Sequence, residues 1–225
     1  MGDDYLYICA ICPNFAARKR HIAMTKEQEI LQAAEEEFLR VGYDACSTAV
    51  IATKAGVTHA MVNYYFRTKE KLFLRILDDH VLELLKNLKP LMSVDGKFVR
   101  VVIDAAEALF DTLAAEPRLP LLISDIARTH PQFLLRYGDT LSTICKDSVN
   151  MHVTRLQQHI AQGSVAPCTM TDIYSTVLTL VLMPFLSLPI LENVATFDEQ
   201  QRTAFLQGRR EEMARILQAR YGTDN

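Results

Sequence analysis

The chain has 225 residues, of which 49% are hydrophobic and 23% are charged, and its formal net charge is −3 at pH 7. This is the composition of an ordinary soluble globular protein with one sizeable core or two smaller ones. The small negative charge argues against attraction to nucleic acid over the whole surface, so any affinity for DNA must come from locally placed groups.

Residues 1–23 come before the first clear helical pattern, and we expect them to form a flexible N-terminal extension. Their basic run Arg18–His21 fits a solvated tail, with an arm for the DNA minor groove as the alternative. Cys9 and Cys12 form a lone C-x-x-C pair without a second pair to complete a zinc site. The five cysteines make no disulfide framework, which fits a reducing cytoplasm, and we expect no metal or other cofactor.

The first predicted helix starts near Met24 and ends at Gly42, because a glycine can enter a left-handed conformation there. Its apolar positions repeat at helical spacing and give one buried stripe, made of Ile30, Leu31, Ala34, Phe38, Leu39 and Val41. The glutamates of this helix lie largely off that stripe; they are Glu27, Glu29, Glu35, Glu36 and Glu37. Ser47 is the predicted N-cap of a second helix, in which Val50 and Ile51 turn inward.

The segment IATKAGVTHAMVNYYF, residues 51–66, predicts a helix, a glycine turn and a short further helix. Gly56 supplies the turn, and Thr58 caps the short helix with its hydroxyl group. Val62 and Phe66, four residues apart, belong inside. Two helices joined across such a turn form a helix-turn-helix, whose second helix fits the major groove of DNA.

The outward side of the short helix mixes hydrogen-bonding groups with apolar ones that can meet a thymine methyl group. The expected DNA-binding residues at the helix starts and on this side are Ser47, Thr58, His59, Ala60, Met61, Asn63 and Tyr64. Tyr65 and Lys69 are expected to contact phosphates, which fix register without reading sequence. Basic residues cluster at this point of the chain; they are Lys54, Arg67, Lys69 and Lys71. A plain three-helix packing unit with half-buried tyrosines is the competing interpretation.

These residues resemble the N-terminal domain of the TetR/AcrR family of bacterial transcription regulators. The positions that carry the resemblance are Ala34, Phe38, Gly42, Tyr43, Ser47, Ile51, Ala52, Ala55, Gly56, Val57, Thr58, Phe66, Lys69, Glu70 and Leu72. The match covers about a fifth of the chain and is highly specific. It implies an all-helical dimer with a separate C-terminal domain that binds a small effector. A tyrosine is usual in the family where this chain has Asn63, so we expect a changed base or phosphate contact there.

The rest of the chain keeps a helical pattern. Helices are predicted at 69–88, closed by Pro90, and near 97–115, 119–129, 133–162, 172–191 and 198–221. We therefore predict an all-α fold with an extension at 1–23, a three-helix DNA-binding domain with the helix-turn-helix at 24–70, and a C-terminal helical bundle for effector binding and dimerisation at 71–225.

The C-terminal bundle is expected to hold a small, mainly apolar effector between its central helices. The candidate lining residues are Phe110, Leu122, Ile126, Phe133, Tyr137, Leu141, Cys145, Tyr174 and Met183. Ordinary core packing is the competing explanation for each of them.

The uncharged run Ile173–Leu191 could be mistaken for a membrane span, but Pro184 and Pro189 interrupt it, so we expect no membrane. With an apolar face from the last helix, this run predicts the contact surface of a homodimer; that face consists of Ala204, Phe205, Ile216 and Leu217. Two-fold symmetry then predicts a roughly palindromic double-stranded DNA operator, bound in the cytoplasm.

A ligand-responsive transcription repressor is the function that this pattern favours. A DNA-binding regulator without a small effector, controlled by a protein partner, is one alternative, and an enzyme is another. The sequence contains no H-E-x-x-H, G-x-S-x-G, P-loop or dinucleotide glycine motif. His152 and His159 share a helix face but have no nearby acidic partner. We therefore expect no enzymatic activity.

Overall fold

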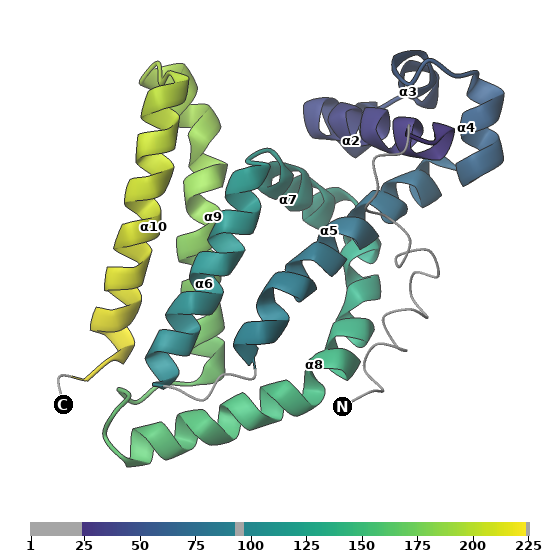
Figure 1. Cartoon of the computed structure of the whole chain (residues 1–225). Coiled ribbons are helices and arrows are strands. Elements are labelled where there is room, and N and C mark those ends of the chain that lie inside the picture. Colours follow the sequence, from purple (N-terminus) through teal and green to yellow (C-terminus); the bar gives the residue numbers. More distant parts are fainter. Residues whose placement is uncertain (1–23, 93–96, 224–225) are drawn as a thin grey trace.

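The structure is a computed structural model that describes residues 24–92 and 97–223, with side chains described for all of these except 88–92 and 138–149. The predicted extension 1–23 lies outside these ranges. The described helices, in chain order, are α2 (Lys26–Ala45), α3 (Thr48–Lys54), α4 (His59–Phe66), α5 (Lys69–Met92), α6 (Phe98–Ala115), α7 (Leu119–Thr129), α8 (Pro131–Ala161), α9 (Met170–Val194) and α10 (Glu199–Tyr221). Within the described ranges no strand forms, and the predicted all-α fold is confirmed (Figure 1).

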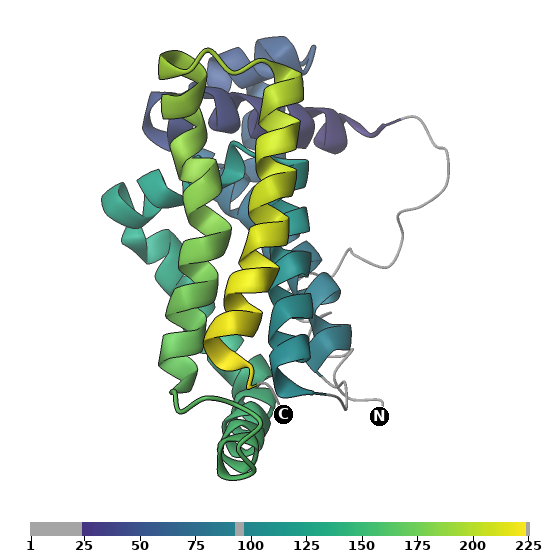
Figure 2. The ribbon, with the colours of Figure 1, turned by 90° about the vertical axis from the view of Figure 1, so that its left-hand side faces the viewer.

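The helices form two groups that α5 connects. Figure 1 shows α2, α3 and α4 together at one end of the molecule, with α5 running from them into the other group. There α6, α9 and α10 stand side by side, and Figure 2 shows α9 and α10 as neighbours along one whole face. The long helix α8 begins next to α7 and ends at the opposite end of the molecule from α3 and α4 (Figure 1).

Local signals in the sequence set the two ends of α2. Thr25 and Gln28 form a capping box, in which each side chain bonds the backbone amide of the other residue. Near the other end, Gly42 has φ 81° and ψ 172°, a conformation that only glycine adopts readily. The regular helix therefore breaks at Gly42 as predicted, although one short turn follows it to Ala45.

The first hydrophobic core lies under the helix-turn-helix but also includes later parts of the chain. It contains the buried side chains of α2 to α5, such as Ile30, Phe38 and Phe73. Leu122 and Ile126 of α7 and Phe133 of α8 belong to the same core. The ring of Phe133 lies 5.1 Å from that of Tyr43 and 5.8 Å from that of Phe73, measured between centroids. The core of the DNA-binding end thus extends past the predicted boundary at residue 70.

The second core joins α6, α9 and α10 to the end of α8. The rings of Phe110 and Phe185 lie 5.0 Å apart, and Leu156 of α8 is buried in the same cluster. Tyr221, at the end of α10, is buried and donates its hydroxyl hydrogen bond to the backbone carbonyl of Asp172 at 3.0 Å. This bond fixes the last turn of α10 against the start of α9.

Helix ends at prolines differ from the prediction. α5 continues to Met92, two residues past Pro90, although Pro90 is predicted to close it. A proline removes a single i→i−4 hydrogen bond, which the last turn of a packed helix can tolerate. α9 contains both Pro184 and Pro189, as does the helix predicted at 172–191.

By length and composition alone, α9 is apolar enough to cross a membrane, which is weak evidence for a single helix. Here it packs against α6 and α10 and buries Val181 and Phe185. Only 28% of its most apolar window is buried, however. Large apolar side chains remain exposed along its length, namely Tyr174, Leu178, Met183, Ile190 and Val194. This helix therefore presents an uncovered apolar surface.

Candidate DNA-binding interface

α3 and α4 form the predicted helix-turn-helix, with the predicted residues at its ends. The Ser47 hydroxyl caps α3 by accepting a hydrogen bond from the amide of Ala49 at 3.3 Å. The Thr58 hydroxyl caps α4 by accepting from the amide of Met61, also at 3.3 Å. In the turn between them, Gly56 has φ 61°, in the left-handed region that favours glycine.

α4 has one buried side and one exposed side. Val62 and Phe66 are buried, as predicted, and Met61 is half-buried. The other predicted base-reading residues are exposed: His59, Ala60, Asn63 and Tyr64, the last with 72% of its surface accessible. Tyr65 is 41% exposed. The structure therefore gathers most of the predicted DNA contacts on one accessible helix surface, next to the caps.

A hydrogen bond fixes the orientation of α4 relative to α3. Nε2 of His59 lies 2.9 Å from Oγ1 of Thr48, which joins the first turns of the two helices. In α3 itself Ile51 is buried, whereas Val50 is 40% exposed rather than turned inward. Val50 thus adds an apolar side chain to the accessible surface of the motif.

Glu37 is buried, contrary to its predicted place off the apolar stripe of α2. Its carboxylate accepts hydrogen bonds from the Arg40 guanidinium and from Nζ of Lys54, both at 2.6 Å. The bonds from Arg40 and then Lys54 outweigh burial and lower the pKa of Glu37 from 4.5 to about 2. The bond from Lys54 joins α2 to the end of α3 and so positions the helix-turn-helix, whereas Arg40 lies within α2 itself.

The sequence predicts a phosphate contact for Lys69, but in the structure its side chain binds backbone carbonyls of the same protein. Its ammonium group donates to the backbone carbonyls of Tyr43 at 3.0 Å and of Asp44 and Cys46 at 3.2 Å. It also lies 4.6 Å from the centre of the Tyr43 ring. An ammonium group has three hydrogens, and these carbonyls use all of them, so Lys69 closes the end of α2.

The predicted effector-lining residues do not come together in one place. Leu122, Ile126 and Phe133 lie in the first core, and Phe110 lies in the second. The Tyr137 hydroxyl donates to Asp78 of α5 at 2.6 Å.

Tyr174 and Met183 are about half exposed on α9. Leu141 and Cys145 lie outside the residues whose side chains are described. A helical period alone does not tell which apolar positions on different helices face each other, and so the predicted lining mixes two cores and an outer surface.

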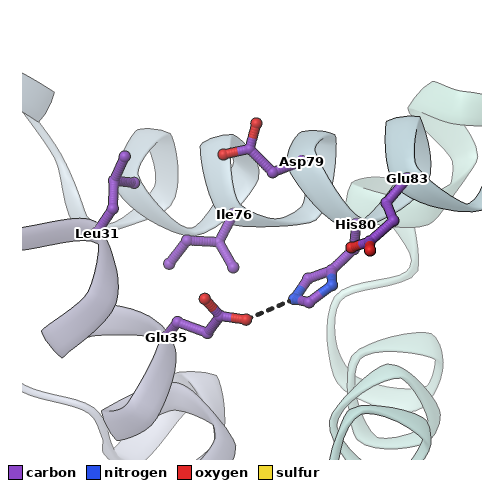
Figure 3. Close-up of a pocket in the computed structure, with 6 residues that line it drawn as sticks. All are labelled: Leu31, Glu35, Ile76, Asp79, His80 and Glu83. Carbon is purple, nitrogen blue, oxygen red and sulfur yellow. Dashed lines mark ion pairs between the residues drawn. The ribbon is translucent and has the colours of Figure 1, made fainter. Parts of the chain in front are cut away.

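A small pocket of about 150 Å³ lies between α2 and α5 (Figure 3). Its lining residues are Leu31, Glu35, Ile76, Asp79, His80 and Glu83. Figure 3 shows Nε2 of His80 paired with the Glu35 carboxylate, at 2.9 Å. The pocket is acidic rather than apolar, and among the described side chains no group of three or more His, Cys, Asp and Glu is arranged to hold a metal ion. The pair between His80 of α5 and Glu35 of α2 connects these two helices.

A second tie connects α2 to the start of α8. Nε2 of His130 lies 2.7 Å from the Asp44 carboxylate. The His130 ring stacks on Phe133 at 5.1 Å and meets Tyr43 edge-on at 4.9 Å. The helix-turn-helix end is therefore joined to the rest of the molecule at α5 and again at the α7–α8 junction.

The residues of this interface have recognisable relatives. A sequence profile described as bacterial regulatory proteins of the tetR family matches residues 30–76, from α2 into α5. Over these residues the chain is similar to the TetR family. Members of this family are DNA-binding transcription regulators and not enzymes.

The HTH-type transcriptional activator FasR of Mycolicibacterium smegmatis is 28% identical to this chain over 146 residues. The match covers 61% of the chain and 66% of FasR, slightly under two thirds of that relative.

Solved structures of regulators share the fold across nearly the whole chain. The ketosteroid transcriptional regulator KstR2 of Mycobacterium tuberculosis has a TM-score of 0.65 at 17% identity, covering 92% of this chain and 100% of KstR2. The fatty acid degradation regulator FadR of Bacillus halodurans has a TM-score of 0.59 at 14% identity, with coverages of 87% and 96%. At these identities the likeness shows the fold alone.

Proposed function

We propose that the chain regulates transcription by binding a roughly palindromic DNA operator as a homodimer, and that a small, mainly apolar effector releases it. The observation that carries this proposal is the exposed face of α4 behind the Thr58 cap. Asn63 and Tyr64 are accessible there and are held on a helix of the right kind to enter a major groove. A chromosomal operator would place the protein in the cytoplasm.

The operator is best found by sequencing the fragments that the purified protein selects from genomic DNA. On the selected site, Asn63→Ala and Tyr64→Ala should each lower specific affinity by about 1–3 kcal/mol per lost base contact. Gln157→Ala, an exposed change on α8, is the matched control and should leave binding unchanged. Wild-type affinity in both α4 variants, with the fold intact, would refute base reading by α4.

The proposed dimer uses α9 and α10. The exposed apolar side chains of α9 need a cover, and the neighbouring α10 adds Ile216, which is 37% exposed, and the exposed Ala204. Two other residues of α10 that the sequence predicts for this surface are not exposed. Leu217 is fully buried in the second core of its own chain, and Phe205 packs against that core. The dimer surface is therefore narrower on α10 than the sequence predicts.

The proposed effector site lies along the middle of α5 instead of at the predicted residues. Val81, Leu82, Leu84 and Leu85 are half-buried there, and they belong to neither of the two core clusters. Apolar side chains that no core uses suit an apolar ligand. KstR2 and FadR, whose names refer to ketosteroids and fatty acids, share the fold and support a ligand of this class.

Effector binding would act on α5, which leads directly into the helix-turn-helix end. A ligand can release DNA only if it binds the non-operator conformation better, because equal affinity for both conformations shifts nothing. Steroids and long-chain fatty acids should therefore raise the melting temperature and weaken operator binding together. Leu84→Gln should abolish both effects, whereas Leu135→Gln at an exposed position of α8 should keep them. Stabilisation without DNA release would favour control by a protein partner.

Repression and activation differ in where the operator lies relative to the promoter. Repression is proposed here, while FasR is named an activator. The position of the selected DNA fragments, combined with a reporter fused to the neighbouring promoter, decides between the two.

A further inference from the structure

The chain between α4 and α5 turns at an unusual residue. Arg67 has φ 66° and ψ −50°, although it is not a glycine. The amide of Thr68 donates to the carbonyl of Phe66 at 2.7 Å, which closes a three-residue turn around Arg67. This is the classic γ-turn, a rare and strained conformation for a residue with a side chain. Strain of this kind gathers at functional positions.

Most basic side chains near the helix-turn-helix are occupied within the protein. Lys26 pairs with Glu29, Arg75 pairs with Asp79, and Arg40 and Lys54 share Glu37; Lys69 is bound to three carbonyls. Arg67 and Lys71 differ from all of these. Both are exposed, and neither charged group has an ion-pair or hydrogen-bond partner among the described residues.

We propose that Arg67 and Lys71 bind the backbone phosphates beside the groove that α4 reads. This proposal rests on the proposed DNA-binding function and specifies which charges supply its sequence-independent part. Arg67 directly follows the last residue of α4, and Lys71 lies in the first turn of α5, so both cations flank the end of the reading helix. A protein with a net charge of −3 needs such locally placed, unpaired cations to hold a polyanion.

The γ-turn fixes the backbone from which the Arg67 side chain would approach a phosphate. A guanidinium group can bind a phosphate through two parallel hydrogen bonds, which demands a defined direction of approach. The turn fixes the backbone of Arg67 between two helices instead of leaving it in a flexible loop. Lys69, two residues further, meanwhile holds the start of α5 against the end of α2.

The test measures binding to a random-sequence DNA duplex at several salt concentrations, which needs no knowledge of the operator. Each phosphate contact contributes about 0.9 to the slope of log affinity against log salt. Arg67→Ala and Lys71→Ala should each flatten the slope by about that amount per bound chain, and the double variant by about twice as much. Lys97→Ala removes an exposed lysine at the start of α6, at the far end of the molecule from α4, and should leave the slope unchanged (Figure 1).

The variant Arg67→Gly distinguishes the role of the Arg67 side chain from the effect of its strained backbone. Glycine tolerates the positive φ, so this variant should melt about 2–4 °C higher than wild type and still show the flattened salt slope. Wild-type slopes in Arg67→Gly and Lys71→Ala would overturn the phosphate assignment while leaving DNA binding in place. A wild-type protein that binds no duplex even at low salt would overturn the proposed function as well.

Discussion

At the scale of single residues, the most consequential side chains are charged groups whose partners lie far away in the chain. Caps and turns at Ser47, Gly56 and Thr58 could be predicted because their partners are two or three residues away, or are the residue's own backbone. The roles of Glu37 and Lys69 could not. The partner Lys54 is seventeen residues from Glu37, and the carbonyls that Lys69 binds are more than twenty residues from it. The helical periodicity of the sequence depends only on apolar residues, so it predicts Glu37 and Lys69 to be surface charges.

Glu37→Gln should lower the free energy of unfolding at pH 7 by about 2 kcal/mol, because it removes the negative charge of a buried acceptor that binds Arg40 and Lys54. Denaturant unfolding monitored by circular dichroism measures the change. Glu36→Gln, at the exposed neighbouring position, should change stability by less than about 0.5 kcal/mol. Equal effects of the two changes would contradict the structural role of Glu37.

The difference in stability between wild type and Glu37→Gln should also depend on pH. The pKa of Glu37 is lowered in the folded state to about 2, so its stabilisation is present above the unfolded value near 4.5 and is lost as pH falls from there through 2. The stability difference between wild type and Glu37→Gln should therefore shrink between pH 5 and pH 3, as about one proton is taken up. A constant difference over that range would argue against the ionised pair.

At the scale of helices, the ties between α2 and its neighbours decide how firmly the DNA-binding end is held. Their existence follows from contacts between helices distant in sequence, and no local pattern predicts them. The sequence predicts nearly all helices in their correct places, yet it assigns Phe133 and Phe110 to one pocket. The structure puts these rings in different cores, because the side of a helix that faces a given neighbour depends on packing across the whole molecule.

Phe133→Ala and Phe110→Ala make a matched pair, since both remove a buried ring. Each should lower the free energy of unfolding by about 3–5 kcal/mol. Only Phe133→Ala should speed hydrogen exchange at the amides of α2, α3 and α4, because its ring belongs to their core. Faster exchange in those helices with Phe110→Ala as well would mean that the two cores act as one.

The pair between His80 and Glu35 predicts a second pH effect, at the α2–α5 joint. Burial lowers the pKa of His80, but the bond to Glu35 and the nearby Glu83 and Asp79 together raise it above its usual 6.5. The pair therefore stabilises below pH 6.5 and loses its effect as pH rises through the folded-state pKa.

Wild type should exceed His80→Gln in stability by about 0.2–1 kcal/mol more at pH 6 than at pH 8. His152 provides a control of opposite sign, because burial and Arg155 lower its pKa. Wild type should lose stability relative to His152→Gln as pH falls to 6. Thermal melts of the three proteins at both pH values test the two signs together.

At the scale of the whole molecule, the uncovered surface of α9 predicts the oligomeric state. Ile190→Glu places a charge at a position that is 63% exposed in the single chain and that the dimer would bury. Sedimentation at micromolar concentration should show a monomer for this variant and a dimer for wild type. Leu135→Glu on α8, where the leucine is 72% exposed, should remain dimeric. A dimer in both variants would place the contact elsewhere.

The shared first core has a consequence for building hybrid regulators. Exchanging the DNA-binding segment 24–70 between relatives would divide one packed core. Leu122, Ile126 and Phe133 belong to that core but lie after residue 70 in the sequence. A transplanted segment would meet foreign side chains there and leave voids or collisions. A workable exchange would carry α7 and the first turns of α8 along with α2 to α5, so the interchangeable part of this regulator is discontinuous in sequence.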